Sequence, residues 1–132
     1  MEFSILLKEL AKLNLPKDKF VIFGSGPMAI RGIRNSEDLD ILVKEDLWKE
    51  LSNKYPLYDT KKPSIKIGNI EIFNNWLPWF KETAKLLEDY DLIQGLRFVK
   101  LKYLVQWKTA MGRDKDLKDV VLIKEFIKDN QE

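Results

Sequence analysis

Two aspartates separated by a single residue, Asp38 and Asp40, are the side chains of this sequence whose spacing most directly suggests chemistry. The segment 38–43 is predicted to form a strand, in which side chains two residues apart leave the same face. Two carboxylates on one face repel each other, and a divalent cation or a basic partner relieves that repulsion. The pair therefore predicts a metal site; the alternative is that both acids end a strand and face water.

A glycine-containing turn lies shortly before the two aspartates. The apolar run 20–23 predicts a buried strand, and Gly24-Ser25 follows it directly. Pro27 suits the first turn of a helix, so Gly24 and Ser25 are expected where a strand meets a helix. Backbone amides at such a junction favour phosphate oxygens. A phosphate site next to a metal site predicts that the chain binds a nucleotide.

A β-hairpin is predicted where the apolar segments 65–67 and 70–73 flank Gly68-Asn69. Glu71 lies in its second strand, on the face opposite its apolar neighbours. If that strand pairs beside the strand of the aspartates, Glu71 can complete the metal shell or take the proton of an acceptor hydroxyl. The alternative is an exposed strand glutamate.

The Gly-Ser turn and the Asp-x-Asp pair, both within the segment 24–43, resemble the signature of the nucleotidyltransferase superfamily. The resemblance implies that Asp38 and Asp40 bind Mg²⁺ (or Mn²⁺) and that a third carboxylate, here Glu71, comes from a nearby strand. It also implies transfer of a nucleoside monophosphate from a nucleoside triphosphate to an acceptor. The nucleotide-binding residues that it implies in this segment are Gly24, Ser25 and Arg31.

A second motif, the segment 101–119, is similar to the later helices of small bacterial and archaeal members, which often end in Gly-Arg-x-Lys-Asp. Its cations Lys108, Arg113 and Lys115 are candidates to neutralise the charge of a triphosphate. The alternative is that they serve structure, with Lys108 paired to Asp116 and Lys115 paired to Asp119 one helical turn away.

The composition narrows the chemistry further. The chain has 132 residues, which suits one domain, and neither cysteine nor histidine occurs. Thiolate and imidazole chemistry and a structural zinc site are therefore excluded. A net charge of +2 gives no uniform field for holding a long nucleic acid. With no secretion signal and no membrane-spanning run, we expect a cytoplasmic protein.

The pattern of apolar residues predicts an α/β (α+β) domain over 1–132, a small mixed sheet flanked by helices with a helical C-terminal segment. The resemblance implies that this domain has the nucleotidyltransferase fold. Strands are expected at 20–23, 38–43, 65–67 and 70–73; helices are expected at 3–13, after Pro27, at 45–54, at 83–89, from 99 to a stop at Gly112, and from a cap at Asp114 onward, with 128–132 frayed. The irregular segment 74–80 receives no prediction.

Two rival functions fit parts of the sequence. Gly24-Ser25-Gly26-Pro27-Met28-Ala29 matches the Gly-x-Gly-x-x-Ala fingerprint of dinucleotide-binding folds, although the helix before Asp38 is too short for a full crossover. A non-catalytic module that binds a nucleotide or a protein partner is the other rival, because Gly26-Pro27 and Glu71 depart from the family pattern. Trp76, Pro78 and Trp79 form a partner surface or complete a core.

The acceptor is left open by the sequence. It can be tRNA, a protein side chain, a small molecule or another nucleotide, and membership of a toxin-antitoxin pair is equally open.

Overall fold

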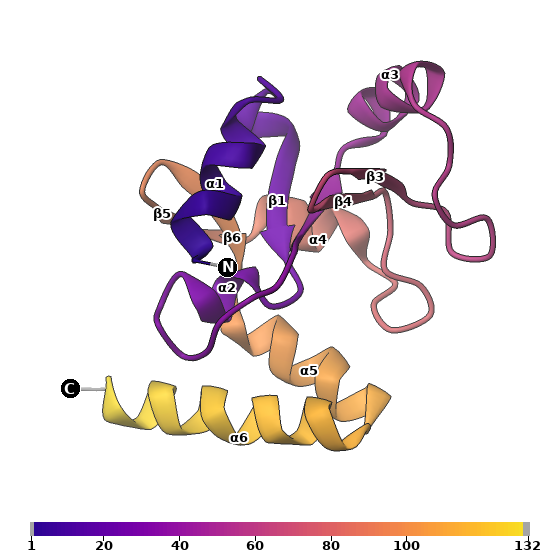
Figure 1. Cartoon of the computed structure of the whole chain (residues 1–132). Helices are drawn as coiled ribbons and strands as arrows, with labels where there is room; N and C mark the ends of the chain where they lie inside the picture. The colour runs from indigo at the N-terminus through magenta and orange to yellow at the C-terminus, as the bar shows by residue number, and fades with distance from the viewer. Residues whose placement is uncertain (1, 131–132) are drawn as a thin grey trace.

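The structure of the protein is a computed structural model that describes residues 2–130 (Figure 1). Within that range a six-stranded sheet has the order β3-β4-β2-β1-β6-β5. The strands are β1 (Phe20–Phe23), β2 (Leu39–Val43), β3 (Ile65–Ile67), β4 (Ile70–Phe73), β5 (Tyr90–Ile93) and β6 (Leu96–Val99). The helices are α1 (Phe3–Ala11), α2 (Gly26–Ala29), α3 (Glu45–Lys54), α4 (Thr83–Glu88), α5 (Leu101–Met111) and α6 (Asp114–Asp129), with a 3-10 turn η1 (Lys17–Lys19).

The sheet mixes parallel and antiparallel pairs. β1 pairs antiparallel with β2, and β3–β4 and β5–β6 are antiparallel hairpins. β2 runs parallel to β4, and β1 runs parallel to β6. Parallel neighbours need a long connection, which α3 and the loop after it provide between β2 and the β3–β4 hairpin.

One face of the sheet is covered by α1 and α3, which lie in the upper part of Figure 1. Alternate strand residues such as Ile22, Ile41 and Ile72 point to this face, as a period of two requires. They pack against Leu6 of α1 and Leu47 of α3, both almost fully buried.

The opposite face of the sheet packs against α4, α5 and α6, of which the last two run along the lower edge of Figure 1. Phe23 of β1 and Leu42 of β2 point to this side and meet Trp107 of α5. Asp40 and Glu71 alternate with residues of the first face and so stand on this second face. Two acids therefore share a face of the sheet with a large aromatic core.

Most predicted elements are confirmed within one or two residues, including the short α2 and the stop of α5 at Gly112, whose φ is +65°. The Gly68 turn joins β3 and β4 with φ +60°, as the hairpin requires. Residues 76–80 form a turn closed by Phe80 N donating to Trp76 O. Trp76 and Trp79 pack against the second core, while Pro78 is exposed. None of the described helices is long and apolar enough for a membrane span.

Some boundaries differ from the prediction. Asp38 precedes β2, which begins at Leu39. Asp114 is the first residue of α6, and the N-cap position is taken by Arg113, whose side chain makes no capping hydrogen bond. α6 continues to Asp129, so Lys128 is helical, whereas 131–132 lie outside the described residues. The β5–β6 hairpin is an element that the sequence analysis missed.

Candidate functional site

A cleft of about 410 Å³ opens between the turn after β1, the start of β2 and the helices α5 and α6. It brings together most of the residues that the sequence singles out: Gly24, Ser25, Asp38, Asp40, Lys108, Arg113 and Lys115. The remaining lining residues are Arg34, Glu37, Lys62, Trp76, Trp107, Met111, Asp116 and Asp119. Arg31 and Glu71 do not line it.

Asp40 is the half-buried acid of the cleft, whereas Asp38 is exposed. In the sheet Asp40 lies between Phe23 of β1 and Glu71 of β4. Burial, together with the negative charges of Asp38 and Glu71, raises the pKa of the Asp40 carboxyl to about 7. The positive charges of Lys62 and Lys66 oppose this rise only in part. The carboxyl therefore lies where positive charge is lacking, a condition that a bound divalent cation would satisfy.

Gly24 makes room for the Asp40 carboxylate. Its φ of +69° is a conformation that side-chain-bearing residues rarely adopt. A Cβ built on Gly24 would stand 2.6 Å from Asp40 Oδ2, well inside van der Waals contact. The glycine is thus required both by the turn and by the acid, and it places the turn's backbone directly against the carboxylate.

Ser25 ties the glycine turn to the segment that leads into β2. Its Oγ lies 2.5 Å from Ser36 Oγ, and Ser36 Oγ in turn donates to the carbonyl oxygen of Asp38. Because Ser36 has a single hydroxyl proton, Ser25 is the donor in the first bond. The Ser25 hydroxyl therefore positions the backbone around Asp38, and its proton is already engaged.

Glu71 stands beside Asp40 in the sheet, on the parallel neighbour strand that the prediction required. Its Oε2 accepts a hydrogen bond of 2.7 Å from the hydroxyl of Ser64, which is fully buried. Across residues 2–130 no group of three or more acidic side chains is arranged to hold a metal ion. On the side of β2 the carboxylates that line the cleft are Glu37, Asp38 and Asp40, with Glu71 next to Asp40 and held by Ser64, whereas Asp116 and Asp119 are paired with cations.

A three-residue ion network forms the opposite wall. Asp119 of α6 accepts hydrogen bonds from Arg34 Nε at 2.7 Å and from Lys108 Nζ at 2.8 Å. Burial raises the pKa of Asp119, but the bonds from Arg34 and Lys108 outweigh it, so the pKa is lowered overall. Lys108 is itself buried, which makes Asp119 its necessary counter-ion.

The other cations of α5 and α6 are placed differently from the structural pairs that the sequence suggested. Arg113 Nε donates to Asp116 at 2.6 Å, so Asp116 pairs with Arg113 and not with Lys108. Asp119 pairs with Lys108 and Arg34, and no ion pair joins it to Lys115 in the described chain. Lys115 is exposed at the rim of the cleft.

Arg31 points to a different part of the molecule. Its guanidinium forms an ion pair of 2.7 Å with Asp91 of β5 and donates to the carbonyl oxygen of Pro27. These contacts link α2 to the β5–β6 hairpin.

Several cleft residues were not predicted as site residues: Arg34, Glu37, Lys62, Trp107 and Met111, together with Trp76, named only for a core or partner surface, and Asp116 and Asp119, named only as structural partners of lysines. Asp116 and Asp119 did carry a signal, because two acids three residues apart share a helix face and both proved buried. Lys62 lies in a polar loop and gave none.

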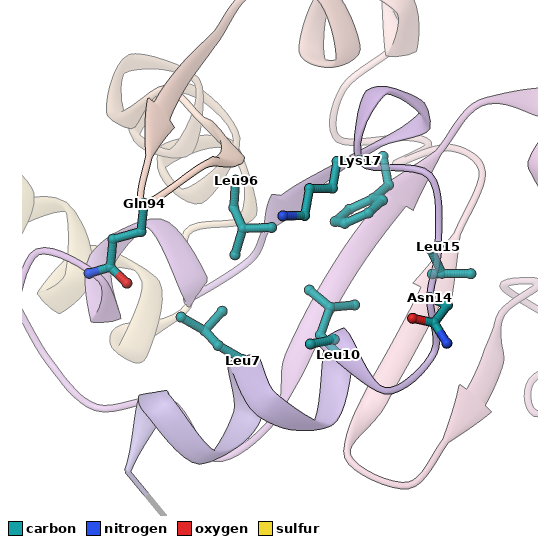
Figure 2. Close-up of a pocket in the computed structure, with 9 residues that line it drawn as sticks. Leu7, Leu10, Asn14, Leu15, Lys17, Gln94 and Leu96 are labelled. Atoms are coloured by element: carbon teal, nitrogen blue, oxygen red, sulfur yellow. The ribbon is translucent and has the colours of Figure 1, made fainter.

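A second cavity, of about 430 Å³, lies on the other side of the sheet (Figure 2). Leu7 and Leu10 of α1 face Leu96 of β6 across it, with Lys17 and Gln94 at its edges. Although it is slightly larger, its lining contains no acidic side chain. It therefore lacks the donors that a hard metal ion prefers.

Comparisons of the chain with protein-family models, with curated proteins and with solved structures found no match. The chemistry of the cleft therefore rests on its geometry. That geometry disfavours the dinucleotide-binding rival, because β1 and β2 are antiparallel and α2 has four residues, whereas the fingerprint belongs to a parallel βαβ unit.

Proposed function

We propose that the chain is a metal-dependent nucleotidyltransferase with the fold of that superfamily. The observation that carries the proposal is the close packing of the Gly24 turn against Asp40, with Asp38 beside it and the cations of α5 and α6 across the same cleft. A glycine turn at the start of a helix, a carboxylate pair and a cationic wall are parts that phosphoryl transfer uses.

The carboxylate pair fits a magnesium ion. Asp38 and Asp40 would hold it, because the raised pKa of Asp40 marks a position without sufficient positive charge. When bound, Mg²⁺ supplies neutralisation of the phosphate charge that develops during transfer. Glu71 is near enough in the sheet to support Asp40, but its hydrogen bond to Ser64 ties it back.

The cationic wall fits a triphosphate. Lys115 carries no ion pair in the described chain and lies at the rim of the cleft. The Arg113 side chain is paired with Asp116 through its Nε and is about half exposed. In the proposed reaction an acceptor oxygen bonds to the α-phosphorus, the bond from that phosphorus to the bridging oxygen breaks, and pyrophosphate leaves. The acceptor's proton passes to a cleft carboxylate or to water. The acceptor itself, RNA, protein or small molecule, is the object of the screen below.

Two measurements test the proposal: the change in thermal midpoint when ligands are added, and the transfer of label from a radiolabelled triphosphate to an acceptor. Mg²⁺ with one of the four nucleoside triphosphates should raise the thermal midpoint more than either alone, since metal and phosphates share one site. Asp38→Asn and Asp40→Asn should remove that rise, whereas Asp18→Asn in the exposed η1 should retain it. Radiolabelled triphosphate should then label total RNA or protein only with wild type and Asp18→Asn. Absence of any metal-dependent shift at millimolar triphosphate would contradict the proposal.

A non-catalytic nucleotide-binding module is the second candidate, and one observation favours it. Glu71 is bound by Ser64, and among the described residues no third acid is arranged with Asp38 and Asp40 to hold a metal ion. This candidate predicts metal-dependent triphosphate binding by wild type without label transfer to any acceptor.

A further inference from the structure

Lys62 is a cation of the cleft that the proposed function does not use. Its Nζ lies 3.3 Å from the centroid of the Trp76 ring, close enough for a cation-π interaction. Both residues line the cleft that contains Asp40. The Lys62 charge also acts on Asp40 and Glu71, although no ion pair within 4.0 Å joins it to either acid.

The loop that carries Lys62 is built to hold it there. Asp59 Oδ1 accepts hydrogen bonds from the backbone amides of Lys61 and Lys62, which folds the tip of the loop. At the far end Ser64 pairs with Asp59 in a bridge and donates its hydroxyl to Glu71. The loop is therefore fastened to the strand next to Asp40, and Lys62 is directed inward while Lys61 is exposed.

The aromatic platform under Lys62 is equally fixed. The Trp76 ring contacts Phe23 at 5.0 Å and Phe73 at 5.6 Å between centroids, and it packs against the second core. Lys62 differs from the cations opposite, since Arg34, Lys108 and Arg113 are each bonded to an acid of α6. An ammonium held on a ring face can leave that face without abandoning a buried carboxylate.

We propose that Lys62 is a polyphosphate-binding residue, stored on the Trp76 ring when the cleft is empty and transferred to phosphate oxygens when a metal polyphosphate enters. It would close the cleft on the side of β2 and β4, opposite Lys108 and Arg113. The inference rests on the proposed function for the location of the phosphates, but it requires no nucleotide base and no transfer.

Magnesium tripolyphosphate is the probe that isolates this role. Lys62→Gln should weaken its binding, measured by calorimetry, about tenfold, because one charge-assisted contact is lost. Lys61→Gln, one residue away on the same loop, should bind as wild type does. The change in tryptophan emission on binding should be present in wild type and in Trp79→Phe and much smaller in Trp76→Phe, since the ammonium leaves the Trp76 ring. Circular dichroism and thermal midpoints establish that each variant is folded.

The outcomes separate this inference from the proposed function. Weaker binding by Lys62→Gln, with unchanged binding by Lys61→Gln, supports the role of Lys62 even if no triphosphate is ever transferred. Absence of transfer would overturn only the catalytic proposal. Equal binding by Lys62→Gln and Lys61→Gln overturns the role of Lys62 while a wild-type transfer activity would still stand. Failure of wild type to bind magnesium tripolyphosphate overturns both.

Discussion

Asp40 is the cleft residue on which burial, neighbouring negative charges and the close approach of the Gly24 turn act together. It is half-buried, it has Asp38 and Glu71 as acidic neighbours, and its carboxylate fits against the turn only because Gly24 carries no side chain. A structural acid would be stabilised by its surroundings, whereas this one is destabilised by them. The sign of its effect on stability therefore separates the two roles.

We predict that Asp40→Asn stabilises the metal-free protein at pH 8 by about 1 kcal/mol and that most of this effect is lost at pH 5. The folded pKa of about 7 lies above the ordinary 3.8. The stability of wild type relative to Asp40→Asn is thus greatest below pH 3.8, where Asp40 is protonated in both the folded and the unfolded chain. It falls as the pH rises and is lowest above about 7, where the buried carboxylate is charged. The stabilisation is small because water reaches part of the Asp40 side chain.

Urea unfolding with a chelator at both pH values measures the effect, with Asp18→Asn as the control for removal of an exposed acid. An Asp40→Asn variant that is less stable than wild type at pH 8 would show that Asp40 serves structure.

Gly24 allows the steric part of this arrangement to be tested separately. Gly24→Ala should destabilise the fold by about 2–4 kcal/mol and prevent metal-dependent triphosphate binding. The new Cβ would overlap Asp40 Oδ2, and alanine would have to adopt the positive φ of Gly24, which is unfavourable for it. Gly32→Ala is the matched control, since Gly32 has φ +73° and no atom within 4 Å of the position of a Cβ. It should show the backbone cost of about 1–2 kcal/mol alone. An equal loss of unfolding free energy in the two variants, measured by urea unfolding, would mean that the Asp40 side chain moves away from the new Cβ without a measurable loss of stability.

At the scale of elements, the sequence predicted what is encoded locally. Strand β1 is an apolar run, β2 is an apolar run with Asp38 and Asp40 at its start, and the β3–β4 hairpin has glycine where its turn needs a positive φ. The β5–β6 hairpin was missed although Gln94-Gly95 stands between two apolar segments and both residues have positive φ. A turn with Gln in the first position is a weak signal, because Asn or Asp usually takes that place.

The part of the candidate site that lies within one local segment was predictable from the sequence, whereas its long-range partners were not. The acids and the glycine turn lie within one segment, so their proximity follows from a strand and a turn. The partners of the cations depend instead on how α6 docks: Asp119 is 85 residues from Arg34 in the chain. Helical spacing places Asp116 and Asp119 on one face, but it does not tell which cation each will meet.

At the scale of the whole molecule, the Asp119 network joins the segment before β2 to the last helix across the cleft. Arg34, Lys108 and Asp119 come from three separate parts of the chain. The cleft therefore exists only when the C-terminal helix is docked. Asp119 holds the cations Arg34 and Lys108 together, and a bound polyphosphate would add further negative charge beside the same two cations.

We predict that Asp119→Asn destabilises the ligand-free protein by about 3–5 kcal/mol, because it leaves buried Lys108 without its counter-ion. Asp116→Asn is the matched change on the same helix face, and it should cost clearly less, since its partner Arg113 is half exposed and water can solvate it. Magnesium tripolyphosphate should then stabilise Asp119→Asn more than it stabilises Asp116→Asn, because phosphate oxygens replace the missing negative charge near Lys108 and Arg34. Urea unfolding of both variants with and without the ligand measures both differences. Equal losses for the two variants, or a ligand effect that is the same for both, would show that the Asp119 network neither holds α6 in place nor faces the bound phosphates.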